Sequence, residues 1–462
     1  MEDVVRLRSL EIRNIKNTVC GVVDMPEKVR KRPFFNGAEV LGIYGQNGSG
    51  KTAVIDALFY LQKLLLGQSL PGELVYDIRK GQEEAEIRAE FLMESGGRRT
   101  EAGYEVLLRR GPDGRAVIGR ERLTMGKETG QRRRSRIVFM EYTDQDGIFT
   151  PKVHLDEVIS GRREIRIGLM AAKKVAQIRN CSYVFGEASR SIWEGESGEK
   201  FAPYAAVIRA LYRYAAMDLI VIRNSHSGAI DANLLLPMSY RTSDRCGAAK
   251  GDFLMTLLEP TVIEESRFSV FQRVVREINL VLQTMVPGLT IGLKDYGGQL
   301  MEDGTAGRRV DLTSVRGDTE IPIRYESSGI IKMISILHVL IRAYHDPGVC
   351  LAVDELDSGV YEYLLGELLE LFGRGAKGQL IFTSHNLRPL EMLDEESILF
   401  STANPENRFI RISSGKKSKN LRDAYIRSIT LGGQKECIYS ETDTLKMARA
   451  FRNAGRGWKD DF

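Results

Sequence analysis

The chain has 462 residues, of which 43% are hydrophobic and 28% are charged. This composition is that of a folded globular protein, and it excludes a wholly disordered, collagen-like or membrane-embedded chain. The 66 lysines and arginines against 62 aspartates and glutamates leave a net charge of +4, so nucleic acid would be bound through local patches and not through bulk charge.

The first elements form a strand–loop–helix unit. Residues 5–12 alternate apolar and charged side chains, as a half-buried strand does, and residues 39–44 form a short apolar strand. Gly45 opens a loop, and residues 53–66 have the length and periodicity of a buried helix. From 86 to 125, short strand-like runs separated by turns predict antiparallel hairpins.

The remaining elements are mostly helical in the middle of the chain and alternate near its end. The stretch from about 150 to 260 is helical by pattern, and a further helix is expected at 268–285. The last part then follows a helix, strand, helix, strand rhythm, which predicts parallel strands. The ranges of these four elements are 330–344, 349–353, 359–372 and 379–383.

The five cysteines are scattered and include no C-x-x-C pair, which fits neither a disulfide framework nor a zinc knuckle. Charged residues interrupt the amino-terminal segment where a signal peptide needs an apolar run, and no apolar stretch approaches the ~18 residues of a membrane span. We therefore expect a cytoplasmic protein with no membrane partner.

The segment from Gly45 to Thr52, with the sequence GQNGSGKT, matches the P-loop pattern G-x-x-x-x-G-K-[ST] after an apolar strand and at the start of a helix. Its glycines let backbone N–H groups turn around phosphate oxygens, and the helix adds the positive end of its dipole. We expect Lys51 to reach the β- and γ-phosphates of ATP, and the Thr52 hydroxyl to bind Mg²⁺. The expected nucleotide-binding residues of this loop are Gly45, Asn47, Gly48, Ser49, Gly50, Lys51 and Thr52.

Two carboxylates end the apolar strand at 349–353. Because a P-loop sheet needs such a partner strand, Asp354 is expected to hold Mg²⁺, and Glu355 is expected to act as the general base for the attacking water. The next strand, at 379–383, leads to His385 at the sheet edge where ligands bind, so His385 is the expected sensor of the γ-phosphate. The other histidines are expected to be structural.

A Ser-Ser-Gly sequence at Ser327, Ser328 and Gly329 opens the predicted helix at 330–344. Such a sequence is ordinarily a helix N-cap with its turn. The same geometry offers hydroxyl and N–H donors to an anion, and its place before the acid pair is the order seen in ABC-type ATPases. The segment Leu356-Asp357-Ser358 follows the acid pair directly, where a dimer-contacting loop would sit.

Taken in order, these motifs resemble the ABC-class ATPase heads of the SMC, Rad50 and RecF group. The turn from Asn14 to Lys16 resembles the one between the first two strands of those heads. More closely, the chain is similar to the bacterial AAA15 family, an ABC-type group with E-S-x-G, D-E-L-D and T-[ST]-H motifs that occurs in anti-phage and abortive-infection systems. The resemblance covers about 1–125 and 265–450.

The resemblance implies an α/β P-loop NTPase fold, an ABC-ATPase head with an antiparallel β lobe and a helical insertion, and ATP and Mg²⁺ as cofactors. It also implies a homodimer or higher homo-oligomer in which the Ser-Ser-Gly residues bind the γ-phosphate held by a second copy, and a separate nuclease or toxin subunit as partner. The nucleotide-binding residues that it adds are Asn14, Lys16, Ser327, Ser328, Gly329 and Asp357. Ser328 departs from the family, which usually has glycine there, and neither Gln82 nor Gln145 fits a Q-loop.

Because Lys51 and Asp354 are far apart in sequence, a large insertion must separate two parts of one head. We expect these parts at 1–125 and 265–462, with a mostly helical insertion or lid at 126–264. Two alternatives remain open: the nucleotide-binding subunit of a transporter, which would lack such an insertion, and a RecF-like DNA-repair ATPase. The second would bind nucleic acid directly through Arg132, Arg133, Arg134 and Arg136.

Overall fold

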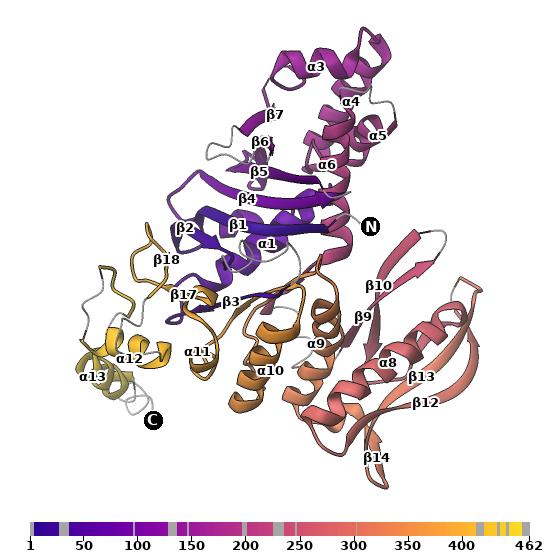
Figure 1. Ribbon diagram of the computed structural model, residues 1–462, viewed down its shortest axis with the longest axis vertical. Coiled ribbons are helices and arrows are strands. Elements are labelled where there is room, and N and C mark those ends of the chain that lie inside the picture. Colours follow the sequence, from indigo (N-terminus) through magenta and orange to yellow (C-terminus); the bar gives the residue numbers. More distant parts are fainter. Residues whose placement is uncertain are drawn as a thin grey trace, which may run out of the picture.

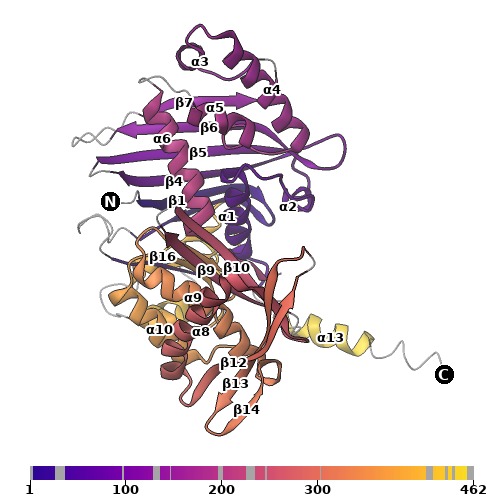
Figure 2. The same ribbon diagram turned by 90° about the vertical axis from the view of Figure 1, so that its right-hand side faces the viewer.

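Two six-stranded sheets lie face to face with helix α1 (Lys51–Leu65) between them, and a smaller sheet with its own long helix lies beside them (Figures 1 and 2). This computed structural model describes residues 4–26, 37–95, 98–127, 136–145, 147–195, 201–224, 235–244, 247–301, 303–412, 420–431, 435–439 and 443–454.

The first sheet is an antiparallel lobe with the strand order β2-β1-β4-β5-β6-β7. Its exposed face carries alternating arginines and glutamates, whereas apolar residues such as Leu10, Ile87 and Phe91 face α1. The predicted strand at 5–12 and the hairpins at 86–125 are confirmed; β2 and β7 were not predicted. The strands are β1 (Val4–Ile15), β2 (Thr18–Asp24), β4 (Glu84–Ser95), β5 (Arg98–Arg110), β6 (Ala116–Lys127) and β7 (Arg136–Thr143).

The second, central sheet has the order β18-β17-β3-β16-β15-β8, and all of its neighbouring strands except β18 are parallel. Every residue of β3, β15 and β16 is buried, as expected for parallel strands covered on both faces. The predicted strands at 39–44, 349–353 and 379–383 are confirmed. The strands are β3 (Glu39–Tyr44), β8 (Leu219–Ile222), β15 (Cys350–Val353), β16 (Gln379–Thr383), β17 (Ile398–Ser401) and β18 (Phe409–Ile410).

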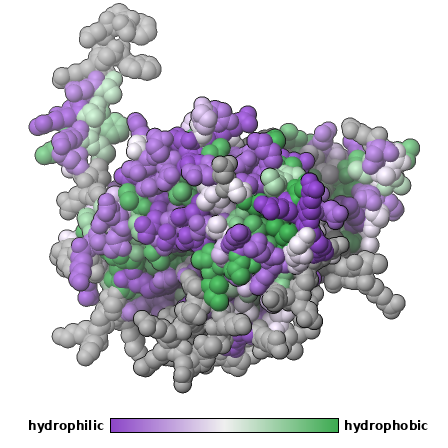
Figure 3. Space-filling model, turned by 90° about the horizontal axis from the view of Figure 1, so that it is seen from above, coloured by the Kyte–Doolittle hydropathy of each residue, from purple (hydrophilic) through white to green (hydrophobic). Residues whose placement is uncertain are grey.

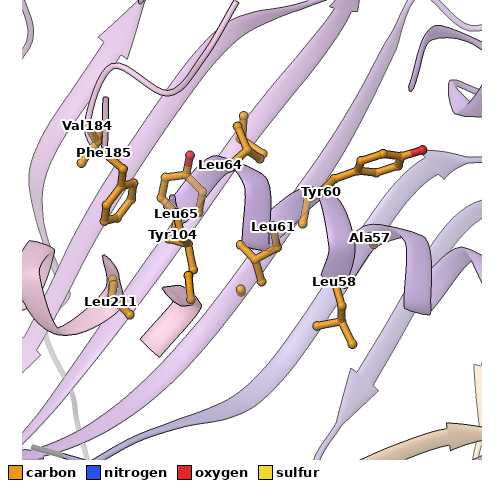
Figure 4. Packing of buried hydrophobic residues seen from close by; sticks show 14 of the residues in the cluster. Ala57, Leu58, Tyr60, Leu61, Leu64, Leu65, Tyr104, Val184, Phe185 and Leu211 are labelled. Carbon is orange, nitrogen blue, oxygen red and sulfur yellow. The ribbon is translucent and has the colours of Figure 1, made fainter. Parts of the chain in front are cut away.

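Helix α1 is apolar on nearly all sides because it packs between the two sheets. Figure 4 shows Leu61, Leu64 and Leu65 of this helix beside Tyr104 of β5 and near Phe185. On the opposite face of the central sheet lie α9 (Ser328–His345) and α10 (Glu362–Gly375), which confirm the last two predicted helices. The start of α1 is thereby fixed against both sheets.

Among its described residues, the stretch predicted to be helical from 150 to 260 has its helices mainly in the first part. The helices there are α3 (Lys152–Ile159), α4 (Arg163–Arg179), α5 (Glu187–Gly195), α6 (Ala202–Arg213) and the π-helical turn η2 (Tyr214–Asp218). After them β8 returns to the central sheet, followed by the strands β9 (Leu235–Asp244), β10 (Gly247–Thr256) and β11 (Thr261–Glu264). The expectation of a mostly helical stretch is therefore wrong for the strands β8 to β11, because periodicity alone does not separate short apolar strands from buried helix.

The smaller sheet packs on α8 (Glu265–Met285), which confirms the helix predicted at 268–285. Its strands are β11, β12 (Leu289–Leu300), β13 (Ala306–Arg316) and β14 (Thr319–Pro322). The shorter remaining elements are α2 (Leu74–Asp77), η3 (Ile323–Tyr325), α11 (Pro389–Met392), η4 (Glu395–Ser397), α12 (Leu421–Leu431) and α13 (Thr444–Ala454).

Two surfaces of the fold carry exposed apolar side chains. Helix α13 buries none of its residues and projects from the body near the carboxy terminus (Figure 2). Figure 3 looks onto the end that α3 and α4 form and shows hydrophobic side chains gathered among hydrophilic ones. The large exposed apolar residues of those two helices include Val153, Ile167, Met170 and Ile178. In the described part of the chain, no helix has the length and apolar character that crossing a membrane requires.

Candidate active site

The predicted P-loop connects β3 to α1 and has the backbone that its glycines allow. Gly50 precedes α1 with φ of 90°, and a Cβ there would lie 2.7 Å from Thr18 Oγ1. A Cβ at Gly45 would lie 1.8 Å from Ser401 Oγ. No side chain of the described residues caps the start of α1, so its first N–H groups face the loop and form an anion site.

Lys51 is folded back over this loop. Its Nζ donates to the carbonyl oxygens of Gly45 at 2.7 Å and of Gln46 at 3.1 Å. Burial lowers the pKa of Lys51, although nearby carboxylates, Asp354 first among them, act in the opposite direction. An ammonium held by neutral carbonyls in this way is ready to exchange them for phosphate oxygens.

Asp354 follows β15 and is fully buried. Its Oδ1 accepts hydrogen bonds from Thr383 Oγ1 at 2.6 Å and from Thr52 Oγ1 at 3.4 Å, whereas Oδ2 has no hydrogen-bond partner among the described residues. Burial raises the pKa of this carboxyl. A buried carboxylate oxygen without a partner, beside a threonine hydroxyl, fits Mg²⁺, which prefers hard oxygen ligands and keeps few protein ligands. Within the described ranges no cluster of three or more histidines, cysteines, aspartates or glutamates could hold a metal ion, so phosphate oxygens and water would complete the shell.

Glu355 has an unusual backbone that the side chains of two other residues hold. Its φ is 50°, which is strained for a residue other than glycine. Its N–H donates to Thr383 Oγ1 at 2.7 Å, and its carbonyl oxygen accepts from Lys332 Nζ at 2.8 Å. Lys332 lies in α9 and is only 2% exposed. Neither Thr383 nor Lys332 was predicted, because their contacts with Glu355 join segments that are distant in sequence.

His385 is exposed at the end of β16 and lies in the same pocket as Lys51 and Glu355. Its N–H donates to Asp357 Oδ2 at 2.9 Å, which ties the segment after the acid pair to the histidine. The pocket has a volume of about 340 Å³, so the structure brings together every residue predicted for catalysis and metal binding. Its lining is Lys16, Asn17, Asn47, Gly48, Gly50, Lys51, Thr52, Ala53, Asp354, Glu355, Thr383 and His385.

The turn between β1 and β2 reaches the pocket through Lys16 and Asn17. Lys16 forms an ion pair with Asp56 of α1, and Asn17 Nδ2 donates to the carbonyl oxygen of Gly48 at 3.0 Å. Asn14 does not line the pocket; its carbonyl oxygen accepts from the N–H of Arg79 at 2.8 Å. The predicted asparagine therefore belongs to the turn itself, and Asn17, which the sequence did not single out, occupies the rim.

Two residues predicted to bind nucleotide, Gly45 and Ser49, bond within the loop or to the neighbouring strand and do not line the pocket. Ser49 Oγ donates to the carbonyl oxygen of Gln46 at 2.6 Å and also contacts Ser401 Oγ, and the Gly45 carbonyl accepts from Lys51. Neither residue lines the pocket that holds Glu355. A further residue that the sequence did not indicate, Arg223 after β8, donates from Nε to Asp56 Oδ1 at 2.7 Å.

The Ser-Ser-Gly residues lie at the start of α9, away from the P-loop pocket. Ser327 is the N-cap, and its Oγ accepts from the Ile330 N–H at 3.4 Å. A Cβ at Gly329 would lie 2.0 Å from the Gly359 carbonyl oxygen, so glycine is required for this contact. Ser327 and Gly329 line a different pocket of about 450 Å³, together with Tyr361 and other residues. Within one chain the structure does not bring Ser327, Ser328 and Gly329 to Lys51.

The predicted nucleic-acid residues Arg132, Arg133 and Arg134 lie outside the described residues. Of Arg136 only the backbone, at the start of β7, is described. Their proposed contact with nucleic acid therefore stays a prediction.

Known proteins resemble this chain in sequence and in fold. The DNA replication and repair protein RecF of Deinococcus radiodurans is 29% identical over 197 residues, which are 41% of this chain; the chain spans about half, 48%, of that relative. Among solved structures, the Smc head domain of Pyrococcus furiosus with an extended coiled coil, bound to the C-terminal domain of ScpA, is 12% identical, covers 88% of this chain and 96% of its own, and has a TM-score of 0.41. The SMC head domain of Thermotoga maritima is 13% identical, covers 88% of this chain and 99% of its own, and has a TM-score of 0.36.

The family described as "AAA domain, putative AbiEii toxin, Type IV TA system" matches residues 40–391, a range that contains the P-loop, the Ser-Ser-Gly residues, the acid pair and the histidine. The fold is that of an α/β P-loop NTPase with an ABC-ATPase head, an antiparallel β lobe and a helical insertion. The finer assignment to the AAA15 family stays a prediction. This chain therefore belongs to the family described as "AAA domain, putative AbiEii toxin, Type IV TA system".

Proposed function

We propose that the protein binds and hydrolyses ATP, and that two copies close around two ATP molecules as a switch. The observation that carries this proposal is the single pocket to which Lys51, Thr52, Asp354, Glu355 and His385 come from three separate segments of the chain. These are the groups that phosphoryl transfer to water needs, since its catalysis consists mainly of positioning and charge stabilisation.

Each side chain has a role that follows from its chemistry. Lys51 and the free N–H groups of α1 bind the phosphates, and Thr52 with Asp354 Oδ2 would hold Mg²⁺, which neutralises phosphate charge when bound. Glu355 accepts a proton from the attacking water, and His385 donates to the γ-phosphate.

The separation of the Ser-Ser-Gly residues from Lys51 supports a site completed by a second copy. Ser327 and Ser328 are exposed, and the pocket that Ser327 and Gly329 line is open to another molecule. In a head-to-head dimer these donors and Asp357 would meet the γ-phosphate bound by the partner copy. Both composite sites would then form together.

Mixing two inactive variants tests this arrangement. Lys51→Ala damages the P-loop half of a site, and Ser328→Arg damages the opposite half, so a mixed dimer keeps one intact site and regains ATPase activity. The matched control mixes Lys51→Ala with Glu355→Gln; both changes lie in the same half, so no intact site forms. Absence of recovery in both mixtures would refute the shared site. Equal recovery in both would also refute it, because recovery would then not depend on which half of the site each variant damages.

The cellular role is proposed from the family alone. We propose that the protein acts in the cytoplasm as the ATPase subunit of an anti-phage defence system, and that closure of the dimer controls a nuclease or toxin partner. Affinity purification from the native host, with Lys51→Ala as the control that stays open, tests whether such a subunit co-purifies in a nucleotide-dependent way.

A second candidate function is direct binding of nucleic acid by a RecF-like ATPase. The similarity to a DNA replication and repair protein favours this candidate. It predicts ATP hydrolysis that nucleic acid stimulates in the absence of any other subunit.

A further inference from the structure

Helix α13 is amphipathic and exposed along its whole length (Figure 2). Met447 and Phe451 lie one turn apart on one face, and their exposed fractions are 45% and 76%. Lys446 and Arg452 flank this face, and the helix contains no acidic residue. A helix of 11 residues is marginal in water by itself, so an amphipathic helix that buries none of its residues is expected to pack on another surface.

The pocket that Ser327 and Gly329 line, called the Ser327 pocket below, has the complementary character. Its lining is mainly apolar and aromatic, and Tyr361 and Tyr363 in it are 68% and 48% exposed. Glu367 is the only charged residue in the part of the lining that the structure describes. The pocket therefore suits an apolar helix face that carries positive charge beside it. Its further apolar residues include Met285, Val286 and Met333.

The apolar end that α3 and α4 form does not suit α13. Helix α4 has five lysines and arginines and a single acidic residue, Glu164. Like charges would therefore oppose the docking of Lys446 and Arg452 there. Of these two exposed apolar surfaces, the Ser327 pocket is the one that fits α13 by charge.

The chain reaches α13 from the rim of the P-loop. Ile438 lines a pocket together with Gly48 and Ser49, and the Cys437 carbonyl oxygen accepts from the N–H of Ala403 at 2.6 Å. Helix α13 begins six residues after Ile438, and six residues span at most about 20 Å. The start of α13 therefore stays close to the P-loop half of the nucleotide site.

The Ser327 pocket belongs to the other half of that site. Within one chain Ser327 and Gly329 lie away from Lys51, and in the proposed dimer they would face the P-loop of the second copy. Such a dimer brings the start of α13 of each copy near the Ser327 pocket of the other. Two-fold symmetry forms this arrangement twice.

We propose that α13 of each copy docks into the Ser327 pocket of the partner, with Met447 and Phe451 inside the pocket and Arg452 beside the partner's Glu367. The contact adds apolar burial and one charge pair to a dimer that ATP closes, and it involves no atom of the nucleotide. This inference rests on the dimer of the proposed function, because only that dimer brings the two surfaces together.

Photo-cross-linking on the full chain tests the contact. The photo-reactive residue p-benzoylphenylalanine replaces Phe451 in the Glu355→Gln background with ATP, and this chain is mixed with a copy that carries an affinity tag and no cross-linker. We expect a covalent product of two chains that depends on ATP and maps to the pocket, where Met285 and Met333 offer reactive side chains. The same photo-reactive residue at Leu300, which is 71% exposed on β12, is the control and should give no such product.

Substitutions test how much the contact stabilises the dimer. Phe451→Asp should raise the dissociation constant of the ATP-bound Glu355→Gln dimer at least about tenfold, since a charge replaces a buried aromatic ring, and should leave the binding of a fluorescent ATP analogue unchanged. Leu445→Asp is the matched control, because Leu445 is 70% exposed on the same helix but lies on its cationic side. Arg452→Glu and Glu367→Arg should each weaken the dimer, and the two changes together should recover affinity.

Several results would overturn the proposal. Unchanged dimerisation of Phe451→Asp, or an equal loss in Leu445→Asp, would show that the Met447 and Phe451 face is not used. A cross-link within a single chain would place α13 in its own pocket, and a cross-link to other segments would place it elsewhere. Loss of binding to vesicles of phosphatidylglycerol and phosphatidylcholine in Phe451→Asp, with the dimer unchanged, would assign α13 to a membrane surface.

The same measurements separate this inference from the proposed function. A Glu355→Gln protein that stays monomeric with ATP would refute the dimer of the proposed function and the docking of α13 with it. An ATP-dependent dimer that neither forms the cross-link nor responds to Phe451→Asp would refute the docking alone.

Discussion

Lys332 provides the sharpest test of how the fold positions Glu355, the proposed catalytic base. The change Lys332→Met keeps an unbranched apolar stem and removes the ammonium that bonds to the Glu355 carbonyl at 2.8 Å. Glu355 would keep its side chain, its bond to Thr383 and the bond that its carbonyl oxygen accepts from the Ser358 N–H, but it would lose one of the three contacts that hold its left-handed backbone. We expect slower hydrolysis with little change in ATP binding.

The size of the effect follows from this bond. A hydrogen bond from a charged donor contributes about 1.5–3 kcal/mol, and a left-handed backbone costs about 1–3 kcal/mol at residues other than glycine. If the bond serves to hold Glu355 in the transition state, its loss lowers kcat by about ten- to hundredfold. Stability should change little, because the substitution removes the desolvation cost of a buried ammonium together with its bond to the Glu355 carbonyl.

The assay measures kcat and KM for ATP, the affinity of a fluorescent ATP analogue, and thermal unfolding. Lys294→Met, a change of the same kind at an exposed position of β12, is the control. A folded Lys332→Met protein with wild-type kcat would refute the reasoning. So would a loss found entirely in nucleotide affinity, since that would mean that Lys332 supports the binding site and not the base.

Four other outcomes are expected. Glu355→Gln should bind ATP, lose at least about a hundredfold in kcat and elute as a dimer with ATP in size-exclusion chromatography; wild-type turnover would contradict the base assignment. Lys51→Ala should no longer bind a fluorescent ATP analogue in a titration. Gly329→Ala should lower the unfolding temperature, at a cost of about 1–3 kcal/mol, because its Cβ would lie 2.0 Å from the Gly359 carbonyl oxygen; an unchanged temperature would show that the contact yields easily. Glu121 is fully buried, and burial raises the pKa of its carboxyl above the usual 4.5. Its contribution to the free energy of unfolding is therefore full below pH 4.5 and is lost as pH rises through the raised pKa. The denaturant midpoint should accordingly depend less on pH in Glu121→Gln.

Contiguous motifs were the part of the site that the sequence could predict. The P-loop from Gly45 to Thr52 and the pair Asp354 and Glu355 each lie in one short segment next to a strand, and the local pattern is sufficient to place them. His385 was predictable for the same reason, as it follows β16 directly. These residues meet because parallel strands end at the same edge of the sheet.

Residues that act through long-range contacts could not be predicted. Thr383 bonds to both carboxylate residues, and Lys332 reaches Glu355 from the face of a helix that reads as ordinary buried core. Asn17 rather than Asn14 faces the pocket because the chain reverses at this turn, which periodicity does not resolve. The strand β8 was not predicted for another reason: its four apolar residues follow a helix, and their pattern is that of a continued helix.

The contacts of α9 connect the Ser-Ser-Gly residues to the catalytic groups of the same chain by two routes. Lys332, one turn after Gly329, bonds to the backbone of Glu355. Gly329 also touches Gly359, which lies two residues after Asp357, and Asp357 Oδ2 accepts the N–H group of His385 at 2.9 Å.

We therefore expect a molecule that shifts the start of α9 to move Glu355, His385 or both, because the buried Lys332 side chain bonds directly to the Glu355 backbone and the Asp357 carboxylate bonds directly to the His385 backbone. A second copy bound at Ser327 would thus act on two active sites. One is the site that the two copies complete together, and the other is the site of the same chain, whose Glu355 and His385 are connected to α9. Loss of cooperativity in ATP hydrolysis by Lys332→Met, with dimerisation retained, would separate this internal route from the contact with the partner's nucleotide.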